Sequence, residues 1–309
     1  MGDWSQFFEK PEIDFSKVSK EELQDRFYGR YYDYYNILSK VMNGDQKERM
    51  AVVAERFEYI LDCFVSQRKQ IIDDFSFRGS GRMLQDIFKS EIGFLNFITE
   101  STDKRDHELS GIVIRDNEDK NDERKIFGAI NKSITYNIIR VLAFEKEKKG
   151  EPFKIPEEVI KYSDRYFRFE DSAVNYLTDL MGNDIYKYYF NGKGREFENR
   201  LFGLYKDALM YLPECQEEVN EFYEELKGNN NKSTKNDALN ILAASYLKNI
   251  ETHLNTTGNY IVENNYDVFV DNCVKLKKAQ MIKKEIERQR EENIEPEYEE
   301  VTKAKKGLK

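Results

Sequence analysis

The residues of this chain whose types suit nucleophilic or metal chemistry are few and widely spaced. The three cysteines are Cys63, Cys215 and Cys273, and the two histidines are His107 and His253. Zinc sites draw on Cys and His at short spacing, and a serine nucleophile of the hydrolase type lies in a G-x-S-x-G turn. Neither pattern occurs. We therefore predict no catalytic residue, no metal site and no cofactor, with an enzyme of unfamiliar active site kept as an alternative.

The glycine-rich turns "FRGSGRML" and "NGKGR" and one acidic loop resemble ligand-binding motifs only in composition. "FRGSGRML" contains Gly79 and Gly81, but Leu84 stands where a dinucleotide-binding loop has its third glycine. The acidic run "RDNEDKNDE" has Asn121 where a calcium loop beginning at Asp116 requires glycine. We interpret these segments as ordinary turns and a solvated loop.

Basic residues offer a second kind of chemistry, which is contact with phosphates or other anions. Between Lys275 and Arg290, seven Lys or Arg stand against two Glu, as in basic helices that meet anionic partners. Two shorter segments, "YSDRYFRF" and "NGKGR", place basic residues beside aromatic rings or glycines. The candidate anion or nucleic-acid contacts are Arg165, Arg168, Lys193, Arg195, Lys277, Lys278, Lys283 and Lys284. The net charge of −9 is opposite to that of a dedicated duplex-binding protein, so nucleic acid is the alternative partner.

The segment "RFYGRYYDYYNIL", residues 26–38, contains five tyrosines and one phenylalanine. At about 100° per residue, Tyr31 and Tyr34 fall on the same helix face as the aliphatic residues of the segment. Tyr28, Tyr32 and Tyr35 extend the apolar surface beyond the roughly 100° stripe that one neighbour covers. These three tyrosines therefore need a second partner, either another helix of the chain or another protein.

The aromatic run "IYKYYF" adds Tyr186, Tyr188 and Phe190 to the candidate protein-interface residues. Asn191-Gly192 follows it, and Asn-Gly is a strong hairpin signal. A small β-hairpin at 185–197 and a helix–loop–helix turn are equally good interpretations of this segment.

Helical signals dominate the rest of the chain. Ser19 and Glu22 form a capping box that predicts a helix start. Met50, Val53 and Phe57 begin a series of apolar residues spaced three and four apart. We predict an all-α, bundle-like fold with at most one small hairpin, near 185–197. The expected organisation is an irregular arm at 1–18, a helical bundle domain at 19–150, a second helical domain at 151–292 and a disordered tail at 293–309.

Composition narrows the class of protein. The chain has 309 residues, 39% hydrophobic and 35% charged, with no apolar run of membrane-spanning length and no signal-peptide pattern. We expect a cytoplasmic protein, from an AT-rich bacterial or phage genome, that does not bind membranes. The favoured function is non-catalytic protein binding or self-association, for example as a phage- or mobile-element-encoded inhibitor or scaffold of a host complex. The alternative is a nuclease subunit or single-strand binder.

Overall fold

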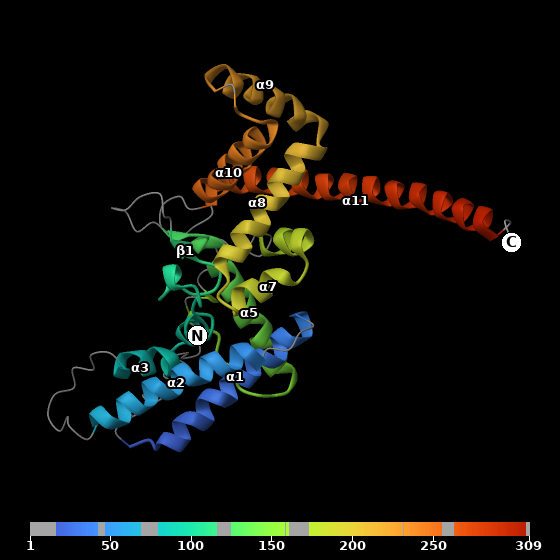
Figure 1. Cartoon of the computed structure of the whole chain (residues 1–309). Helices are drawn as coiled ribbons and strands as arrows, with labels where there is room; N and C mark the ends of the chain where they lie inside the picture. Colours follow the sequence, from blue (N-terminus) through green and yellow to red (C-terminus); the bar gives the residue numbers. More distant parts are fainter. Residues whose placement is uncertain are drawn as a thin grey trace, which may run out of the picture. The chain divides into compact units, whose positions relative to one another are not determined.

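The structure is a computed structural model of the whole chain (Figure 1). It describes residues 17–42, 47–68, 80–115, 125–157, 159–160, 173–230, 232–254 and 263–306. Over these residues the fold is all-α with one small antiparallel sheet, and the all-α class is as predicted. In the part of the chain that is described, no helix is both long and apolar enough to span a bilayer.

The chain divides into two compact units. The N-terminal unit comprises Met1–Val174 and Met181–Arg195, and the C-terminal unit comprises Asn175–Leu180 and Glu196–Lys309. The main division thus falls at residues 195 and 196, whereas the sequence suggested 150 and 151. The difference arises because α7 (Asp184–Phe190) contacts the helices of the N-terminal unit.

The N-terminal unit is built on a pair of antiparallel helices, which lie side by side in Figure 1. The capping box of Ser19 and Glu22 is confirmed, because the Glu22 amide donates to Ser19 Oγ over 3.1 Å. The Phe27 ring stacks on the Phe57 ring, with centroids 3.8 Å apart and planes 5° apart. The pair consists of α1 (Lys20–Met42) and α2 (Lys47–Arg68). The further elements of this unit are α3 (Ser80–Lys89), α4 (Glu91–Ile98), the 3-10 turn η2 (Lys104–Asp106), β1 (Ile114–Arg115), β2 (Lys125–Ile126), α5 (Gly128–Lys148) and α7.

Arginines from the α1–α2 pair bind the carbonyl groups at the ends of α3 and α4. Arg30 donates to the Ile87 carbonyl oxygen over 2.5 Å. Buried Arg49 donates through Nε to the Ile98 oxygen and through Nη2 to the Glu100 oxygen, both over 2.9 Å. The last carbonyls of a helix lack intrahelical donors and carry partial negative charge. These guanidinium groups therefore have a structural role. Burial lowers the pKa of Arg49 to about 10, and the group stays charged at pH 7.

Residues 185–197 form a helix–turn–helix, not a hairpin. α7 ends at Phe190, a turn follows at Asn191-Gly192, and α8 (Gly194–Tyr211) begins. Gly192 has φ +63°, and a Cβ there would lie 2.5 Å from the Glu100 carbonyl oxygen. Asn-Gly favours the left-handed backbone that hairpin turns and helix ends share, so the dipeptide alone does not separate them. The small sheet pairs Ile114 with Ile126 instead.

The described residues of the C-terminal unit form four long helices. α8 ends before Leu212, and Pro213 occupies the first turn of α9 (Pro213–Asn229), where its missing N–H costs no hydrogen bond. Thr234 and Asp237 cap each other reciprocally at the start of α10 (Lys235–Leu254). α10 packs against α9 and against α11 (Glu263–Lys306). α11 thus continues through most of the segment that the sequence suggested would be disordered.

Candidate functional site

The three tyrosines proposed as interface residues on α1 differ in their surroundings. Tyr32 is 52% exposed. The Tyr28 hydroxyl donates to Glu58 Oε1 over 3.0 Å, and its pKa is raised to about 12 by burial and by that carboxylate. Half-buried Tyr35 lies nearly parallel to Tyr31, with ring centroids 6.5 Å apart. Of this set, Tyr32 is the residue that offers an exposed ring.

The aromatic run of α7 lies largely inside the N-terminal unit. Phe190, an interface candidate, is fully buried, with its ring 5.9 Å from that of Tyr31. Half-buried Tyr186 donates its hydroxyl to Asn137 Oδ1 over 3.2 Å, and Tyr188 is also half-buried. Phe190 therefore belongs to the core, because α7 covers the second face of α1 within the same unit.

The two candidate cations at the start of α8 have different positions. Arg195 Nε lies 3.0 Å from Oδ2 of Asp106, whose side chain is almost fully buried. A charge buried in this way requires a partner, so this ion pair is part of the framework of the N-terminal unit. Lys193 is exposed. Arg165 and Arg168 lie outside the described residues.

The basic residues of α11 are mostly engaged within the C-terminal unit. Lys277 donates to the Asp179 carbonyl oxygen over 2.5 Å. Lys278 and Lys283 form ion pairs of 2.8 Å with Glu214 and 2.9 Å with Asp207, respectively.

Lys284 is exposed. Three of the four candidate lysines on this helix thus bind acceptors of their own unit, and the local excess of positive charge is partly neutralised there.

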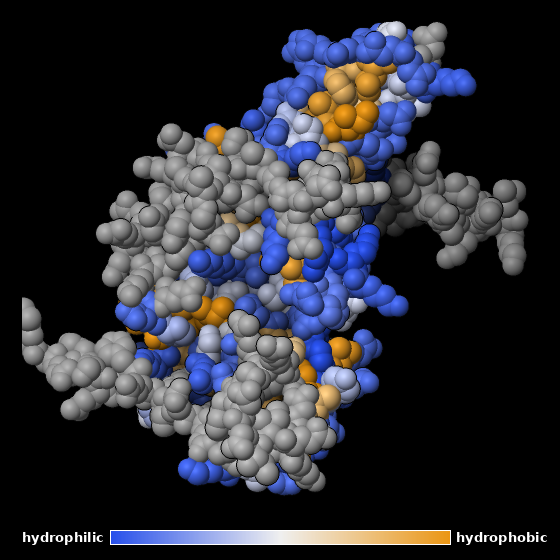
Figure 2. All heavy atoms as spheres, turned by 90° about the vertical axis from the view of Figure 1, so that its left-hand side faces the viewer, coloured by the Kyte–Doolittle hydropathy of each residue, from blue (hydrophilic) through white to orange (hydrophobic). Residues whose placement is uncertain are grey.

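An apolar surface covers part of the α9–α10 pair. Figure 2 shows apolar atoms gathered over these two helices near the top of the view, bordered by polar residues. Val219 is the one fully buried residue of α9, all of whose residues are described. Ile241 on α10 is 47% exposed. We call this the α9–α10 surface. The large apolar residues of the two helices that are half-buried or exposed include Phe222 and Leu226 on α9 and Leu239, Ile241 and Leu242 on α10.

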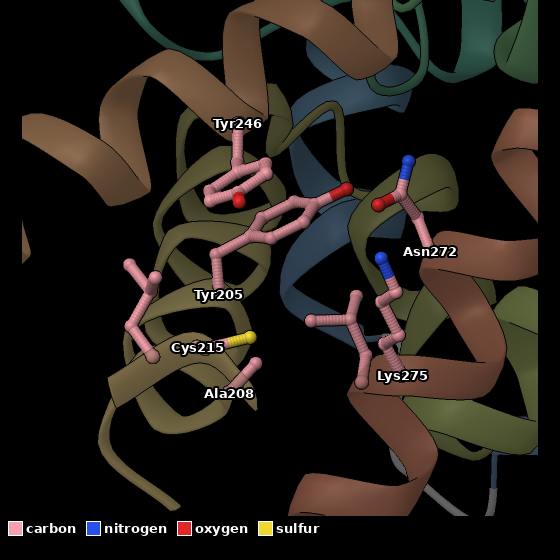
Figure 3. Close-up of a pocket in the computed structure, with 8 residues that line it drawn as sticks. Tyr205, Ala208, Cys215, Tyr246, Asn272 and Lys275 are labelled. Carbon is pink, nitrogen blue, oxygen red and sulfur yellow. The ribbon is translucent and has the colours of Figure 1, made fainter. Parts of the chain in front are cut away.

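A small hollow with about 30 Å³ of enclosed space, partly open to solvent, lies among the four helices of the C-terminal unit (Figure 3). Tyr205 of α8 and Tyr246 of α10 stack along one side, with centroids 5.9 Å apart and planes 6° apart. The Tyr205 hydroxyl points toward the side of the hollow where Asn272 and Lys275 of α11 end. The lining residues are Tyr205, Ala208, Leu209, Cys215, Tyr246, Asn272, Lys275 and Leu276.

The polar groups of this hollow are suited to binding. The Tyr205 hydroxyl oxygen is buried and has no hydrogen-bond partner among the described residues, and burial raises its pKa far above the ordinary value. Burial, with Glu214 and Glu218 nearby, also raises the pKa of the Cys215 thiol. Both groups are neutral at pH 7, so the hydroxyl is a donor and the thiol is a poor nucleophile.

The sequence did not single out this hollow. Its walls come from four helices, and Tyr205, Tyr246 and Asn272 carry no local motif that distinguishes them from other helical residues. Within the described ranges, no group of three His, Cys, Asp or Glu is placed to hold a metal ion. The chain matched no protein-family model, no curated protein and no solved structure when compared with each.

Proposed function

We propose that this protein is a non-catalytic binding or assembly protein whose α9–α10 surface docks on another protein. The composition favours a cytoplasmic inhibitor or scaffold, of bacterial or phage origin, that acts on a host protein complex. The observation that carries the proposal is the apolar surface formed by α9 and α10. In addition, Val219 is the one buried residue of α9.

Exposed single apolar residues are common on proteins, whereas a contiguous group with a polar border is typical of an interaction site. Phe222 and Leu226 are one turn apart on α9, and α10 packs against this helix. Ile241 lies on α10 with 47% of its surface accessible. Association with an apolar surface of a second protein would remove these side chains from water, at about 25 cal/mol per Å² of apolar area.

A nucleic-acid partner has less support. The basic part of α11 is the segment that best suits nucleic-acid binding. There, Lys278 and Lys283 form ion pairs with Glu214 and Asp207, respectively. Phosphate binding would have to compete with these carboxylates. The salt dependence of binding separates the two functions, because phosphate contacts weaken steeply as salt rises.

The test uses Ile241→Asp, which places a charge at the exposed large apolar position of α10, and Val52→Asp as its matched control. Val52 is β-branched, 43% exposed and lies on a helix of the other unit. Cross-linked partners from host lysate and the mass in solution are measured for the wild type and both variants. We expect partner capture, or self-association, to be lost with Ile241→Asp and kept with Val52→Asp, with circular dichroism unchanged in both.

Equal capture by the two variants, or no association by the wild type, would contradict the proposal. Labelled single-stranded and duplex nucleic acids are titrated in parallel at low salt. Binding that Ile241→Asp leaves intact and that falls with added salt would favour the nucleic-acid function instead.

A further inference from the structure

We propose that the hollow lined by α8, α9, α10 and α11 is a binding site for a carboxylate group carried on a small apolar body. This site is separate from the α9–α10 surface, and the proposal does not depend on protein binding. It rests on one buried hydroxyl, one cation and one amide that line the same hollow, and on the apolar residues between them.

The buried hydroxyl of Tyr205 is the first observation. Tyr205 is 3% exposed, and its hydroxyl oxygen has no hydrogen-bond partner among the described residues. A buried polar group without a partner costs roughly 1–3 kcal/mol, and native structures leave few of them. Figure 3 shows the hydroxyl directed toward the polar side of the hollow. An acceptor atom that enters the hollow would satisfy it.

The cation is Lys275. Its neighbours on α11, Lys277 and Lys278, bind the Asp179 carbonyl and the Glu214 carboxylate. For Lys275 itself, no acceptor lies within hydrogen-bond or ion-pair distance among the residues that the structure describes. Its side chain lines the hollow, together with that of Asn272 one turn earlier. An ammonium group, an amide and a hydroxyl offer a carboxylate three donors, and charge-assisted hydrogen bonds are stronger than neutral ones.

The acidic residues near the hollow are already engaged. Glu214 pairs with Lys278 over 2.8 Å, and Glu218 accepts the Tyr246 hydroxyl over 2.6 Å. Lys278, and to a smaller extent Lys275, lower the pKa of the Glu214 carboxyl. Lys275 makes no hydrogen bond or ion pair with the described residues, so it is the lysine of the hollow that an incoming anion can bind.

The apolar wall is formed by Ala208, Leu209 and Leu276. It selects for a carboxylate attached to a hydrocarbon group over a fully hydrated inorganic anion, because contact with the wall removes apolar surface from water. The enclosed space is about 30 Å³, well below the volume of sites that enclose a drug-sized ligand, so only the carboxylate end of a small ligand enters the hollow. The source of the carboxylate is either a free small acid or an acidic side chain of a peptide.

Cys215 lines the hollow and provides a reporter in the full-length protein. Cys273 is buried, so Cys63→Ser leaves Cys215 as the accessible thiol among the three cysteines. The rate of its alkylation by iodoacetamide is measured with propionate, benzoate, and a Glu-containing tripeptide with blocked ends. Propionamide and benzamide are the neutral controls of matched shape, and sodium chloride controls for ionic strength.

We expect saturable slowing of alkylation by the carboxylates and not by the amides or chloride. Protection by propionate or benzoate indicates a free acid as the source, whereas protection by the tripeptide alone indicates a peptide. Tyr205→Phe and Lys275→Met should each weaken protection about tenfold or more. Lys284→Met, an exposed lysine on the same helix that does not line the hollow, should leave it unchanged.

The melting temperature provides a second measurement. Carboxylates should raise it in the wild type by mass action and much less in Tyr205→Phe. Without ligand, Tyr205→Phe should be as stable as the wild type or more so, because it removes a hydroxyl that lacks a partner. Equal protection by acids and amides would overturn the proposal. The proposal would also be overturned if no probe had an effect at concentrations up to about 100 mM, which is far above a millimolar Kd. That result would mean that the hollow holds water only.

Discussion

The ring of Tyr31 on α1 lies 5.9 Å from the ring of Phe190 on α7, although the two residues are far apart in the sequence. α1 thus contributes apolar residues to two sides. Phe27 stacks on Phe57 of α2, and Tyr31 faces α7. Both residues of the Tyr31–Phe190 pair are fully buried. The second apolar face of the tyrosine-rich helix is therefore covered largely by its own unit and not by a partner.

Replacing Phe190 by Ala should destabilise the protein by about 3–5 kcal/mol, because it opens a cavity beside Tyr31 in the core. Urea denaturation followed by circular dichroism measures this loss. Tyr32→Ser is the matched aromatic control from α1, and 52% of Tyr32 is exposed. It should change the free energy of unfolding by less than about 1 kcal/mol. Similar losses for the two variants would show that Phe190 is not a core residue.

Replacing Arg49 by Met should cost about 2–4 kcal/mol, because the carbonyls of Ile98 and Glu100 would lose their buried donors. Arg49→Lys should recover little of this loss, since one ammonium group does not reproduce the two-pronged guanidinium geometry. Lys104→Met, at an exposed position, is the control. Chemical denaturation measures the free energy of unfolding of the three variants. If Arg49→Lys were as stable as the wild type, the guanidinium group would not be needed to bind these carbonyls.

Stability should fall as pH rises from about 9 to about 12, in part because of Cys273. Burial raises the pKa of this thiol from 9.0 to about 12. Between these two values the unfolded chain loses the proton and the folded chain keeps it, so the folded state binds more protons and stability declines with pH.

The contribution of one group is at most about 1.4 kcal/mol per pH unit. It is measured as the difference between the wild type and Cys273→Ala, since tyrosines also titrate in this range. Parallel pH profiles for the two proteins would contradict the assignment.

α9 should open locally more readily than α5. Ten residues of α5 are buried, whereas α9 has Val219 alone in that class. Few buried apolar contacts are typical of segments with a low free energy of local opening. Hydrogen–deuterium exchange should therefore show faster exchange for α9 peptides. A partner bound at the α9–α10 surface should slow that exchange and leave α5 unaffected, whereas protection of α9 equal to that of α5 in the free protein would contradict this expectation.

The sequence by itself determined the helical class and the inner face of α1. Leu23, Phe27 and Tyr34 share one face at about 100° per residue, and all three are buried. The sequence also predicted the capping box at Ser19, because this motif joins residues only three apart. Such signals are local, and their energies depend on neighbours within one or two helical turns.

The tertiary structure decided what lies against each face. Asn191-Gly192 ends a helix, and Gly192 lies so close to the Glu100 carbonyl that a side chain would not fit there. The lysines of α11 found acceptors such as Asp207, which lies on another helix. The hollow that contains Tyr205 and Lys275 exists only because four helices meet there. Periodicity fixes which side of a helix avoids water, whereas contacts between distant segments follow from the packing of whole side chains, and a single sequence carries no local pattern for that packing.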